Sequence, residues 1–382
     1  MRIAVDARPA AFPQRTGVGQ YTWQLLRWMP SLDADSDYVA WYLNARGLMG
    51  GPTRAFREIA RSNLHERWTP WPARWFRPLE QRGDFPRVEW LTRFDVFFAP
   101  NFVPPPTRTK RLVITVHDLA FRLFPATAPH GTKRWLDRLD RALDQAARII
   151  VVSEQTKRDL LQLYAVDRGR VVVIPNGVDA APFQKVTDDD VSRVRQRFGL
   201  DGPFLLYLGG IELRKNLPTL VRAFASLPSD VTCTLVFAGG RTEWNPEGWN
   251  DLRASLDELP EPARRRVRIL GYVSETDKPA LLHGAEGLVY PSLYEGFGLQ
   301  VLEAMAAGTP VLTSNVSALP EVAGDAALLV DPKDTSAIAH GMHELLCNDE
   351  LRERLRVLGK ARVDHFSWSA AARRTVEVLH QA

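Results

Sequence analysis

Short apolar runs alternate with helix-like stretches along almost the whole chain. In the first half, buried strands are predicted at 2–6, 95–99, 112–117, 148–152 and 171–174, with helices near 18–29, 132–147 and 154–163. In the second half, strands are predicted at 204–208, 233–238, 267–270, 286–290, 309–312 and 327–330, with helices near 217–227, 275–284, 299–307, 335–347 and 350–365. This alternation predicts an α/β protein with parallel sheets covered by helices.

The chain has 382 residues, more than one ordinary core accommodates, so two domains are expected. A break near 178–203 carries an acidic run that suits the first turn of a helix. We expect one Rossmann-like, doubly wound domain at 1–180 and another at 181–366, with a C-terminal helix in 367–382 that packs back on the first. Because ligands of such sheets bind at the carboxyl ends of the strands, the cleft between the domains is the expected site.

The composition indicates the cellular compartment in which the protein is expected. Two cysteines, Cys233 and Cys347, are too few for a disulfide framework and favour a reducing compartment. The sequence contains no apolar run of about 18 residues, and no signal-like apolar stretch follows Met1. We therefore expect a cytoplasmic protein, and we expect no nucleic-acid partner.

The charge of the chain is unevenly spread. The net charge is +4, but residues 1–180 hold 27 Lys and Arg against 18 Asp and Glu, while the remainder holds 22 against 27. The basic half could meet an anionic acceptor or bind peripherally to the inner face of a membrane, or its charges could simply be solvated. The segment 67–93, rich in tryptophan and arginine, leaves a similar choice between contact with lipid or acceptor and an irregular loop packed by its own aromatics.

The densest signal lies between Tyr290 and Pro310, which read YPSLYEGFGLQVLEAMAAGTP. A strand is expected to end at Tyr290, and a helix to begin near Leu299 after a loop with two glycines. Such glycines allow a ligand close to the backbone, and the free N–H groups of a helix start suit an anion such as phosphate. Glu295 and Glu303 can face one cleft, where carboxylates bind sugar hydroxyls well.

Glu295 and Glu303, with EGFG and EAMAAGTPV around them, resemble the paired-glutamate signature of the retaining glycosyltransferase family 4 (group 1), and of its mannosyltransferases in particular. The resemblance extends over nearly the whole chain, through GVGQYT, VHDLAF, VVSEQTKRDL, VIPNGVD, YLGGIELRKN and FAGG. It implies the GT-B architecture, in which two Rossmann-like domains face each other across a cleft.

The resemblance also implies roles for single residues. Glu295, with the backbone of Gly296, Phe297 and Gly298, would hold the donor sugar. Glu303 would hold the ribose, and the N–H of Leu299 would meet the diphosphate.

A departing diphosphate gathers negative charge and needs a positive partner. Arg214 and Lys215 follow the strand FLLYL and would clamp the diphosphate, although Gly210 stands where many family members have the arginine. Asp-x-Asp pairs at 33/35, 35/37 and 188/190 could hold a metal instead. Because none follows a strand at the expected cleft, we interpret them as solvated turns or caps and expect neither a metal nor another cofactor.

Two further groups complete the expected site. His117 and Asp118 end the strand LVITV, and family members use this histidine near the reacting carbon; a satisfied core histidine is the alternative. The loop of Gly17 and Gly19 would approach the diphosphate and the acceptor.

The base of the nucleotide is expected beside Val273, with Glu275 and Lys278 close by. A carboxylate suits the donor edge of guanine, although Glu275 could equally belong to an acidic first turn capped by Ser274.

The expected function is transfer of a hexose, mannose from GDP-mannose, to a hydroxyl of a saccharide or lipid-linked oligosaccharide in polysaccharide or lipopolysaccharide assembly, with the anomeric configuration retained. Two alternatives stay open: a sugar-nucleotide epimerase of the same architecture and a non-catalytic partner in a glycan assembly complex.

Overall fold

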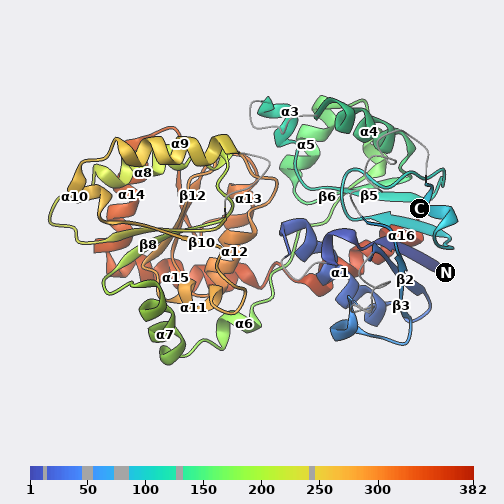
Figure 1. Cartoon of the computed structure of the whole chain (residues 1–382), viewed down its shortest axis with the longest axis horizontal. Coiled ribbons are helices and arrows are strands. Elements are labelled where there is room, and N and C mark those ends of the chain that lie inside the picture. The colour runs from blue at the N-terminus through green and yellow to red at the C-terminus, as the bar shows by residue number, and fades with distance from the viewer. Residues whose placement is uncertain (12–14, 45–54, 73–85, 126–131, 241–245) are drawn as a thin grey trace. The chain divides into compact units, whose positions relative to one another are not determined.

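The computed structural model describes residues 1–11, 15–44, 55–72, 86–125, 132–240 and 246–382. It divides into two compact units (Figure 1). The first comprises Met1–Leu119, Gly131–Gly177 and Trp368–Ala382, and the second comprises Ala120–His130 and Val178–Ser367. That residues 1–180 serve the acceptor and 181–366 the donor stays a prediction.

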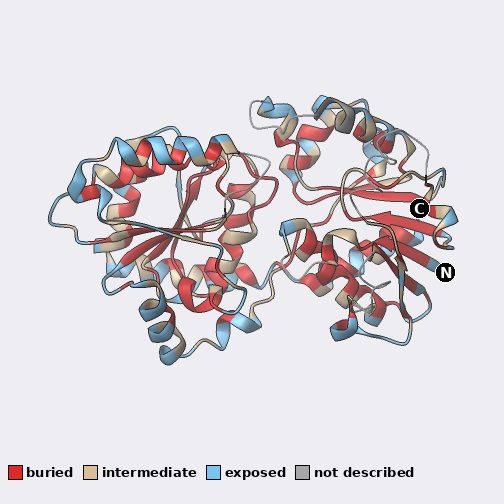
Figure 2. Cartoon of the chain, in the orientation of Figure 1, coloured by how far each residue is buried: buried red, intermediate tan, exposed pale blue. Residues whose placement is uncertain are grey.

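The first unit is built on a seven-stranded sheet in which every strand pair is parallel, in the order β3-β2-β1-β4-β5-β6-β7. The strands are β1 (Arg2–Asp6), β2 (Asp37–Leu43), β3 (Leu64–Thr69), β4 (Val96–Ala99), β5 (Leu112–Val116), β6 (Arg148–Val151) and β7 (Val171–Val173). Their apolar runs are almost wholly buried, as expected for parallel strands covered on both faces (Figure 2). The chain order reverses beside β1, which makes the carboxyl ends of β1 and β4 a topological switch point.

Helices cover both faces of this sheet. They are α1 (Gly17–Leu32), α4 (Thr132–Gln145), α5 (Glu154–Leu163) and the C-terminal α16 (Trp368–His380), with short 3-10 turns at Arg8–Ala10, Arg57–Ile59, Val88–Trp90 and Arg168–Arg170. Helix α16 packs along α1, and Nε2 of His380 lies 2.9 Å from Asp33.

One expectation for this unit was wrong in part. Asp33 is a helix cap, as expected, since it is the C-cap of α1, but it is not solvated: its carboxylate is buried and accepts a hydrogen bond from the hydroxyl of Tyr38 at 2.8 Å, because β2 returns directly beside the end of α1. The choice for the segment 67–93, between contact with lipid or acceptor and an irregular loop, stays a prediction: β3 runs through Trp68 to Thr69, and a 3-10 turn ends at Trp90, whose side chain is exposed. Trp75 and Phe76 lie outside the described residues.

The second unit has a six-stranded sheet, again parallel at every pair, in the order β10-β9-β8-β11-β12-β13. The strands are β8 (Phe204–Leu208), β9 (Thr234–Ala238), β10 (Val267–Gly271), β11 (Gly287–Tyr290), β12 (Val311–Ser314) and β13 (Leu328–Val330). The chain winds one way from β8 and the other way from β11, so these neighbouring strands form the switch point of this sheet.

Right-handed crossovers place α8 and α9 on one face of this sheet and α11, α12 and α13 on the other (Figure 1). Helix α14, which follows the last strand, packs against α8. The helices are α3 (Ala120–Leu123), α6 (Ala181–Gln184), α7 (Asp188–Phe198), α8 (Leu217–Ala225), α9 (Pro246–Asp257), α10 (Glu261–Arg264), α11 (Lys278–His283), α12 (Leu299–Ala306), α13 (Leu319–Ala323), α14 (Thr335–Cys347) and α15 (Asp349–Val363). The acidic run begins α7 as predicted, with Thr187 and Asp190 forming a reciprocal capping box. Within the described part of the chain, no helix is long and apolar enough to cross a membrane.

Candidate functional site

The loops that follow β8 and β11 meet at the switch point of the second sheet. The two strands are adjacent, with Leu288 in register with Leu206. Beyond the strand ends, the N–H of Leu293 donates to the carbonyl of Arg214 at 2.8 Å. This contact joins the 3-10 turn Leu213–Lys215 to the loop that carries Glu295, so side chains that are 80 positions apart share one site.

Glu295 is the centre of a compact charged cluster. Its Oε1 accepts a hydrogen bond from Nζ of Lys215 at 2.5 Å, and its Oε2 accepts one from Arg214 at 2.7 Å. Arg214 also donates to Glu212 at 2.9 Å, and Lys215 also donates to the hydroxyl of Tyr290 at 2.7 Å. The side chains of Lys215 and Glu295 are both more than nine-tenths buried.

The electrostatics of this cluster favour the charged carboxylate. Burial alone would raise the pKa of Glu295, but Lys215 and Arg214 more than offset it and lower the pKa to about 2. Burial and the nearby Arg214 lower the pKa of Lys215, and Glu295 opposes that shift. We take the pair to be ionised, because a buried carboxylate with two cations on it is better charged than neutral. With Glu212, two cations face two carboxylates.

The contacts of Arg214 and Lys215 with carboxylates of the protein itself were not predicted from the residue types. The sequence predicted that Arg214 and Lys215 clamp a diphosphate, and the structure shows that both also donate hydrogen bonds to Glu295. Their role toward a ligand stays a prediction.

The glycine loop leads directly into α12. Gly298 has φ +103°, and a Cβ there would lie 2.7 Å from the side chain of Leu319, so the position requires glycine. No described side chain caps α12 at its first residue, Leu299, and an uncapped helix start suits an anion. Phe297 is buried, and its ring lies 5.7 Å from that of Phe366. Its side chain therefore packs in the protein interior, and only its backbone could contact a ligand at this loop.

A second charged group lies where α11 and α12 meet. Nζ of Lys278 lies 2.7 Å from Glu303 and 2.8 Å from Glu275. Burial lowers the pKa of Lys278, but the two carboxylates more than offset it, so the pKa lies above its ordinary value. Burial raises the pKa of Glu303 despite its contact with Lys278. Val273, which precedes this turn, is buried, whereas the side chain of Glu275 is 64% exposed.

The remaining predicted residues belong to the first unit. His117 follows β5; its Nε2 lies 2.9 Å from the carbonyl of Pro100, and its ring meets Tyr21 edge-on at 4.8 Å. Burial lowers its pKa, so a neutral ring that donates from Nε2 leaves Nδ1 free to accept a hydrogen bond. Asp118, the next residue, is half-buried.

Gly17 and Gly19 both lie in the first turn of α1, the helix that carries Tyr21 to His117. They differ in their surroundings. A Cβ on Gly19 would lie 2.6 Å from the carbonyl oxygen of Pro9, whereas one on Gly17 would meet no described atom within 4 Å. Gly19 is therefore required by packing, whereas the described residues leave room for a side chain at Gly17.

Several residues around these clusters were not predicted from the sequence. Glu212, Tyr290 and Gln300 extend the network of Glu295, with the Tyr290 hydroxyl donating to Gln300 at 3.2 Å. Their position could have indicated them: Tyr290 is the last residue of β11, Glu212 lies shortly after the end of β8, and Gln300 is the second residue of α12. Among the described residues, no group of three or more His, Cys, Asp or Glu side chains lies close enough to hold a metal ion.

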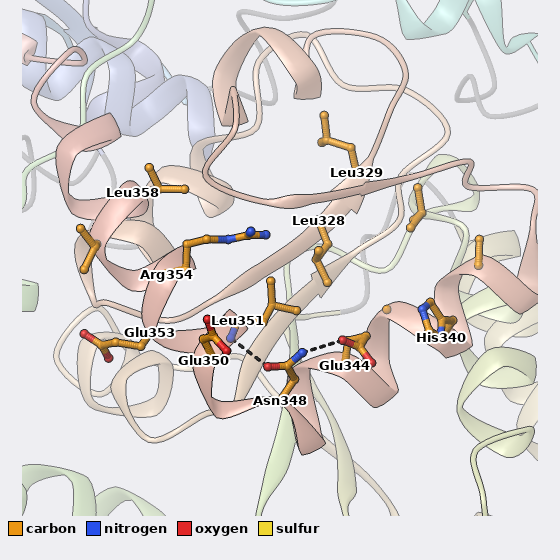
Figure 3. A pocket seen from close by; sticks show the side chains of 14 residues that line it. Leu328, Leu329, His340, Glu344, Asn348, Glu350, Leu351, Glu353, Arg354 and Leu358 are labelled. Carbon is orange, nitrogen blue, oxygen red and sulfur yellow. Dashed lines mark hydrogen bonds between the residues drawn. The ribbon is translucent and has the colours of Figure 1, made fainter.

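A hollow of about 1050 Å³ lies elsewhere in the second unit (Figure 3). It is formed by the edge strand β13 with α14 and α15, and Leu329, Leu351 and Arg354 are among the side chains that line it. None of the predicted site residues lines it. The buried Lys215–Glu295 pair and the uncapped start of α12 lie instead at the switch point.

Comparison with known proteins agrees with these observations. Residues 188–362 match the family described as glycosyl transferases group 1, and residues 15–181 match glycosyltransferase family 4. The O-antigen chain mannosyltransferase B of Escherichia coli is 30% identical over 391 aligned residues, which cover 98% of each chain.

Solved structures show the same fold. HepE of Anabaena, in complex with UDP and glucose, superposes with a TM-score of 0.74 at 17% identity, covering all of both chains. The sucrose-phosphate synthase of Thermosynechococcus elongatus gives 0.75 at 22% identity, covering 100% of this chain and 98% of that one. With the two parallel sheets, these likenesses confirm the GT-B architecture.

Proposed function

Because the chain belongs to the group 1 glycosyltransferases of family 4, and is thus a hexosyltransferase, we propose that it transfers mannose from GDP-mannose to a hydroxyl of a saccharide or lipid-linked oligosaccharide. The anomeric configuration of the mannose is retained. The acceptor belongs to the assembly of a lipopolysaccharide-type chain, in keeping with the O-antigen mannosyltransferase that the chain resembles.

One observation supports the donor site: the buried Lys215–Glu295 pair precedes the uncapped start of α12, and the partly buried Lys278–Glu303 pair lies about one turn inside the same helix. The diphosphate lies at the N–H of Leu299, beside Arg214 and Lys215. Glu295 keeps its hydrogen bonds to Arg214 and Lys215. Its remaining lone pairs accept hydrogen bonds from sugar hydroxyls, since a carboxylate offers about four acceptor positions. Glu303 accepts the ribose hydroxyls.

The choice of guanine rests on the second pair. Lys278 bridges Glu303 and Glu275, so the ribose and base positions are linked by one ammonium group. The exposed carboxylate of Glu275 can accept from the N–H groups on the Watson–Crick edge of guanine. Uracil and adenine do not present that pair of donors.

In the reaction, the acceptor hydroxyl attacks on the face from which the diphosphate departs. The sugar–phosphate bond breaks as the new glycosidic bond forms, and the departing phosphate oxygen takes the acceptor proton. Arg214, Lys215 and the start of α12 stabilise the charge that develops on the diphosphate. This chemistry needs no covalent nucleophile, and we propose that it also needs no metal. The unprotonated Nδ1 of the neutral His117 ring accepts a hydrogen bond from a hydroxyl of the sugar or the acceptor.

The acceptor is assigned to the first unit. This unit holds His117, Gly17 with no described atom within 4 Å of an added Cβ, and most of the basic half of the chain. Its exposed Trp90 and the arginines nearby suit an anionic carrier lipid, so peripheral contact with a membrane surface is part of the proposal.

The two alternative functions, an epimerase and a non-catalytic partner, differ from a transferase in what they require of the site. A sugar-nucleotide epimerase acts without an acceptor, and a non-catalytic partner does not require the Lys215–Glu295 and Lys278–Glu303 pairs. The intact pairs favour transfer.

The test is an assay of GDP-mannose turnover with and without saccharide and lipid-linked acceptors, with the product linkage read by NMR. Transfer predicts turnover that depends on the acceptor and a mannosidic bond of the donor's configuration. Conversion of the donor without any acceptor would support the epimerase instead, and a product of inverted configuration would contradict retention.

A further inference from the structure

Two residues other than glycine have a positive φ in the described part of the chain: Asn216 at 60° and Ser317 at 56°. The left-handed conformation is unfavourable for residues with a Cβ, and it persists where the surrounding structure enforces it. Asn216 directly follows Lys215, and Ser317 contacts Glu295. Both unusual conformations therefore adjoin the same ion pair.

Asn216 anchors the turn that carries Lys215. Its buried side-chain Nδ2 donates to the carbonyls of Pro291 at 3.1 Å and Pro332 at 2.6 Å. Pro291 follows β11 and Pro332 follows β13, so one amide group ties the Lys215 turn to two neighbouring loops. Asn216 is both the residue that follows the 3-10 turn and the N-cap of α8. Its left-handed conformation joins these two elements and keeps its side-chain amide within hydrogen-bonding distance of the carbonyls of Pro291 and Pro332.

Ser317 anchors the loop that carries Glu295. The N–H of Glu295 donates to Oγ of Ser317 at 3.0 Å, and the carbonyl of Glu295 accepts from the N–H of Ala318 at 3.3 Å. The turn before α13 thus holds the backbone of Glu295 on both its donor and its acceptor. The carboxylate is then directed at Lys215 and Arg214.

We propose that Asn216 and Ser317 are positioning residues, whose strained conformations fix Lys215 and Glu295 where the diphosphate and the sugar of the donor require them. The assignment rests on the proposed function, and it goes beyond it in naming residues that touch neither substrate. Asn216 acts on the diphosphate through Lys215, and Ser317 acts on the sugar through Glu295.

Substitution of Ser317 or Asn216 by glycine separates an effect on the position of the ion pair from an effect on stability. Ser317→Gly removes the hydroxyl that accepts from Glu295 but also relieves the strained φ, so the two effects on stability oppose each other. The same holds for Asn216→Gly. Thr187→Ala is the matched control in the same unit: it removes the capping box of α7, far along the chain from the ion pair, and lowers stability without touching the site.

The experiment measures thermal midpoint, kcat for GDP-mannose and Kd for free GDP in all three variants of the full chain. Ser317→Gly is expected to keep a midpoint close to that of the unaltered protein, to lower kcat about tenfold or more and to leave Kd for GDP nearly unchanged. Asn216→Gly is expected to raise Kd for GDP about tenfold. Thr187→Ala is expected to lower the midpoint and leave kcat and Kd unchanged.

Unchanged kcat in Ser317→Gly, or unchanged Kd in Asn216→Gly, overturns the proposal, as does a loss of activity that simply follows the midpoint as stability falls. An unaltered protein that binds no GDP overturns the proposed donor, not the positioning. In that case the ion pair itself is measured: both glycine variants should raise the pKa of Glu295 in a ¹³C NMR titration, and a pKa that stays unchanged in both overturns the positioning.

Discussion

Nζ of Lys278 lies 2.7 Å from Oε1 of Glu303, across 25 positions of sequence, and joins the start of α11 to α12. Lys278 was expected near the base and Glu303 at the ribose, and the structure shows the two side chains in direct contact. The neighbouring cluster of Lys215 and Glu295 repeats the arrangement at the loop before α12. We propose separate roles for these two pairs, Lys278 and Glu303 toward the nucleotide and Lys215 and Glu295 toward the diphosphate and the sugar.

Replacement of Glu303 and replacement of Glu295 should therefore impair different steps, nucleotide binding in the first case and turnover in the second. Glu303→Ala should weaken binding of free GDP and of GDP-mannose alike, by about 1.5–3 kcal/mol, the scale of a hydrogen bond to a charged group. Glu295→Ala should leave free GDP binding nearly unchanged and depress turnover. Calorimetry and steady-state kinetics check both, with the exposed Glu258 changed to Ala as the control. Equal loss of GDP binding in both variants would show that the assigned roles are wrong.

Lys215→Ala should weaken binding of the nucleoside diphosphate by roughly 1.5–3 kcal/mol, because a charged hydrogen-bond donor is lost from the phosphate. Lys185→Ala, at an exposed lysine of the same unit, should leave it unchanged. Since these side chains supply the positive charge, a chelator should leave activity intact. Activity that disappears in EDTA and returns with magnesium or manganese would refute this assignment.

The pKa of Glu295 predicts an acid-dependent contribution to stability. Its pKa is about 2 in the folded protein against an ordinary value of 4.5, so the stabilisation is present above about pH 4.5 and is lost as the pH falls toward 2. Between about pH 6 and pH 3 this contributes on the order of 2 kcal/mol. Urea unfolding should show a shallower pH dependence in Glu295→Gln than in the unaltered protein. Parallel curves for the two proteins would mean that the carboxylate is not held by Lys215 and Arg214.

Gly17 and Gly19 form a matched pair in one helix turn. Gly19→Ala should destabilise the first unit by about 1–3 kcal/mol, because its Cβ would overlap the carbonyl of Pro9. Gly17→Ala should change stability by less than about 0.5 kcal/mol, since no described atom lies within 4 Å of the added Cβ. Thermal unfolding measures both effects. If Gly17→Ala also lowers turnover while stability holds, the loop lies against a substrate; equal destabilisation by the two changes would contradict the packing difference.

The sequence was sufficient for much of this fold. Continuous apolar runs such as FLLYL predicted the buried parallel strands, and the loop from Tyr290 to Leu299 predicted the glycine turn and the helix that follows. The strand β2 was missed although Tyr38 to Tyr42 are all buried, because its aromatic residues follow α1 so closely. The strand β3 was missed because it is an edge strand with mixed polar and apolar residues.

The site was predicted as residues but not as contacts. Lys215 and Glu295 were each singled out, yet their pairing depends on β8 and β11 being neighbours, which no local pattern indicates. The left-handed φ of Asn216 and Ser317 could not be predicted either, because neither residue type requires it and only the surrounding hydrogen bonds enforce it.

Titration of the full chain with GDP, UDP and ADP tests most directly whether the second unit holds a guanosine diphosphate sugar. A ligand that binds the folded state raises its stability by RT ln(1 + [L]/Kd), about 2.7 kcal/mol at a hundredfold excess over Kd. We predict the largest rise in thermal midpoint with GDP, a further rise with GDP-mannose, and loss of both in Glu303→Ala. A larger rise with UDP or ADP would contradict the assignment of guanine, and no rise with any of the three would contradict the donor site itself.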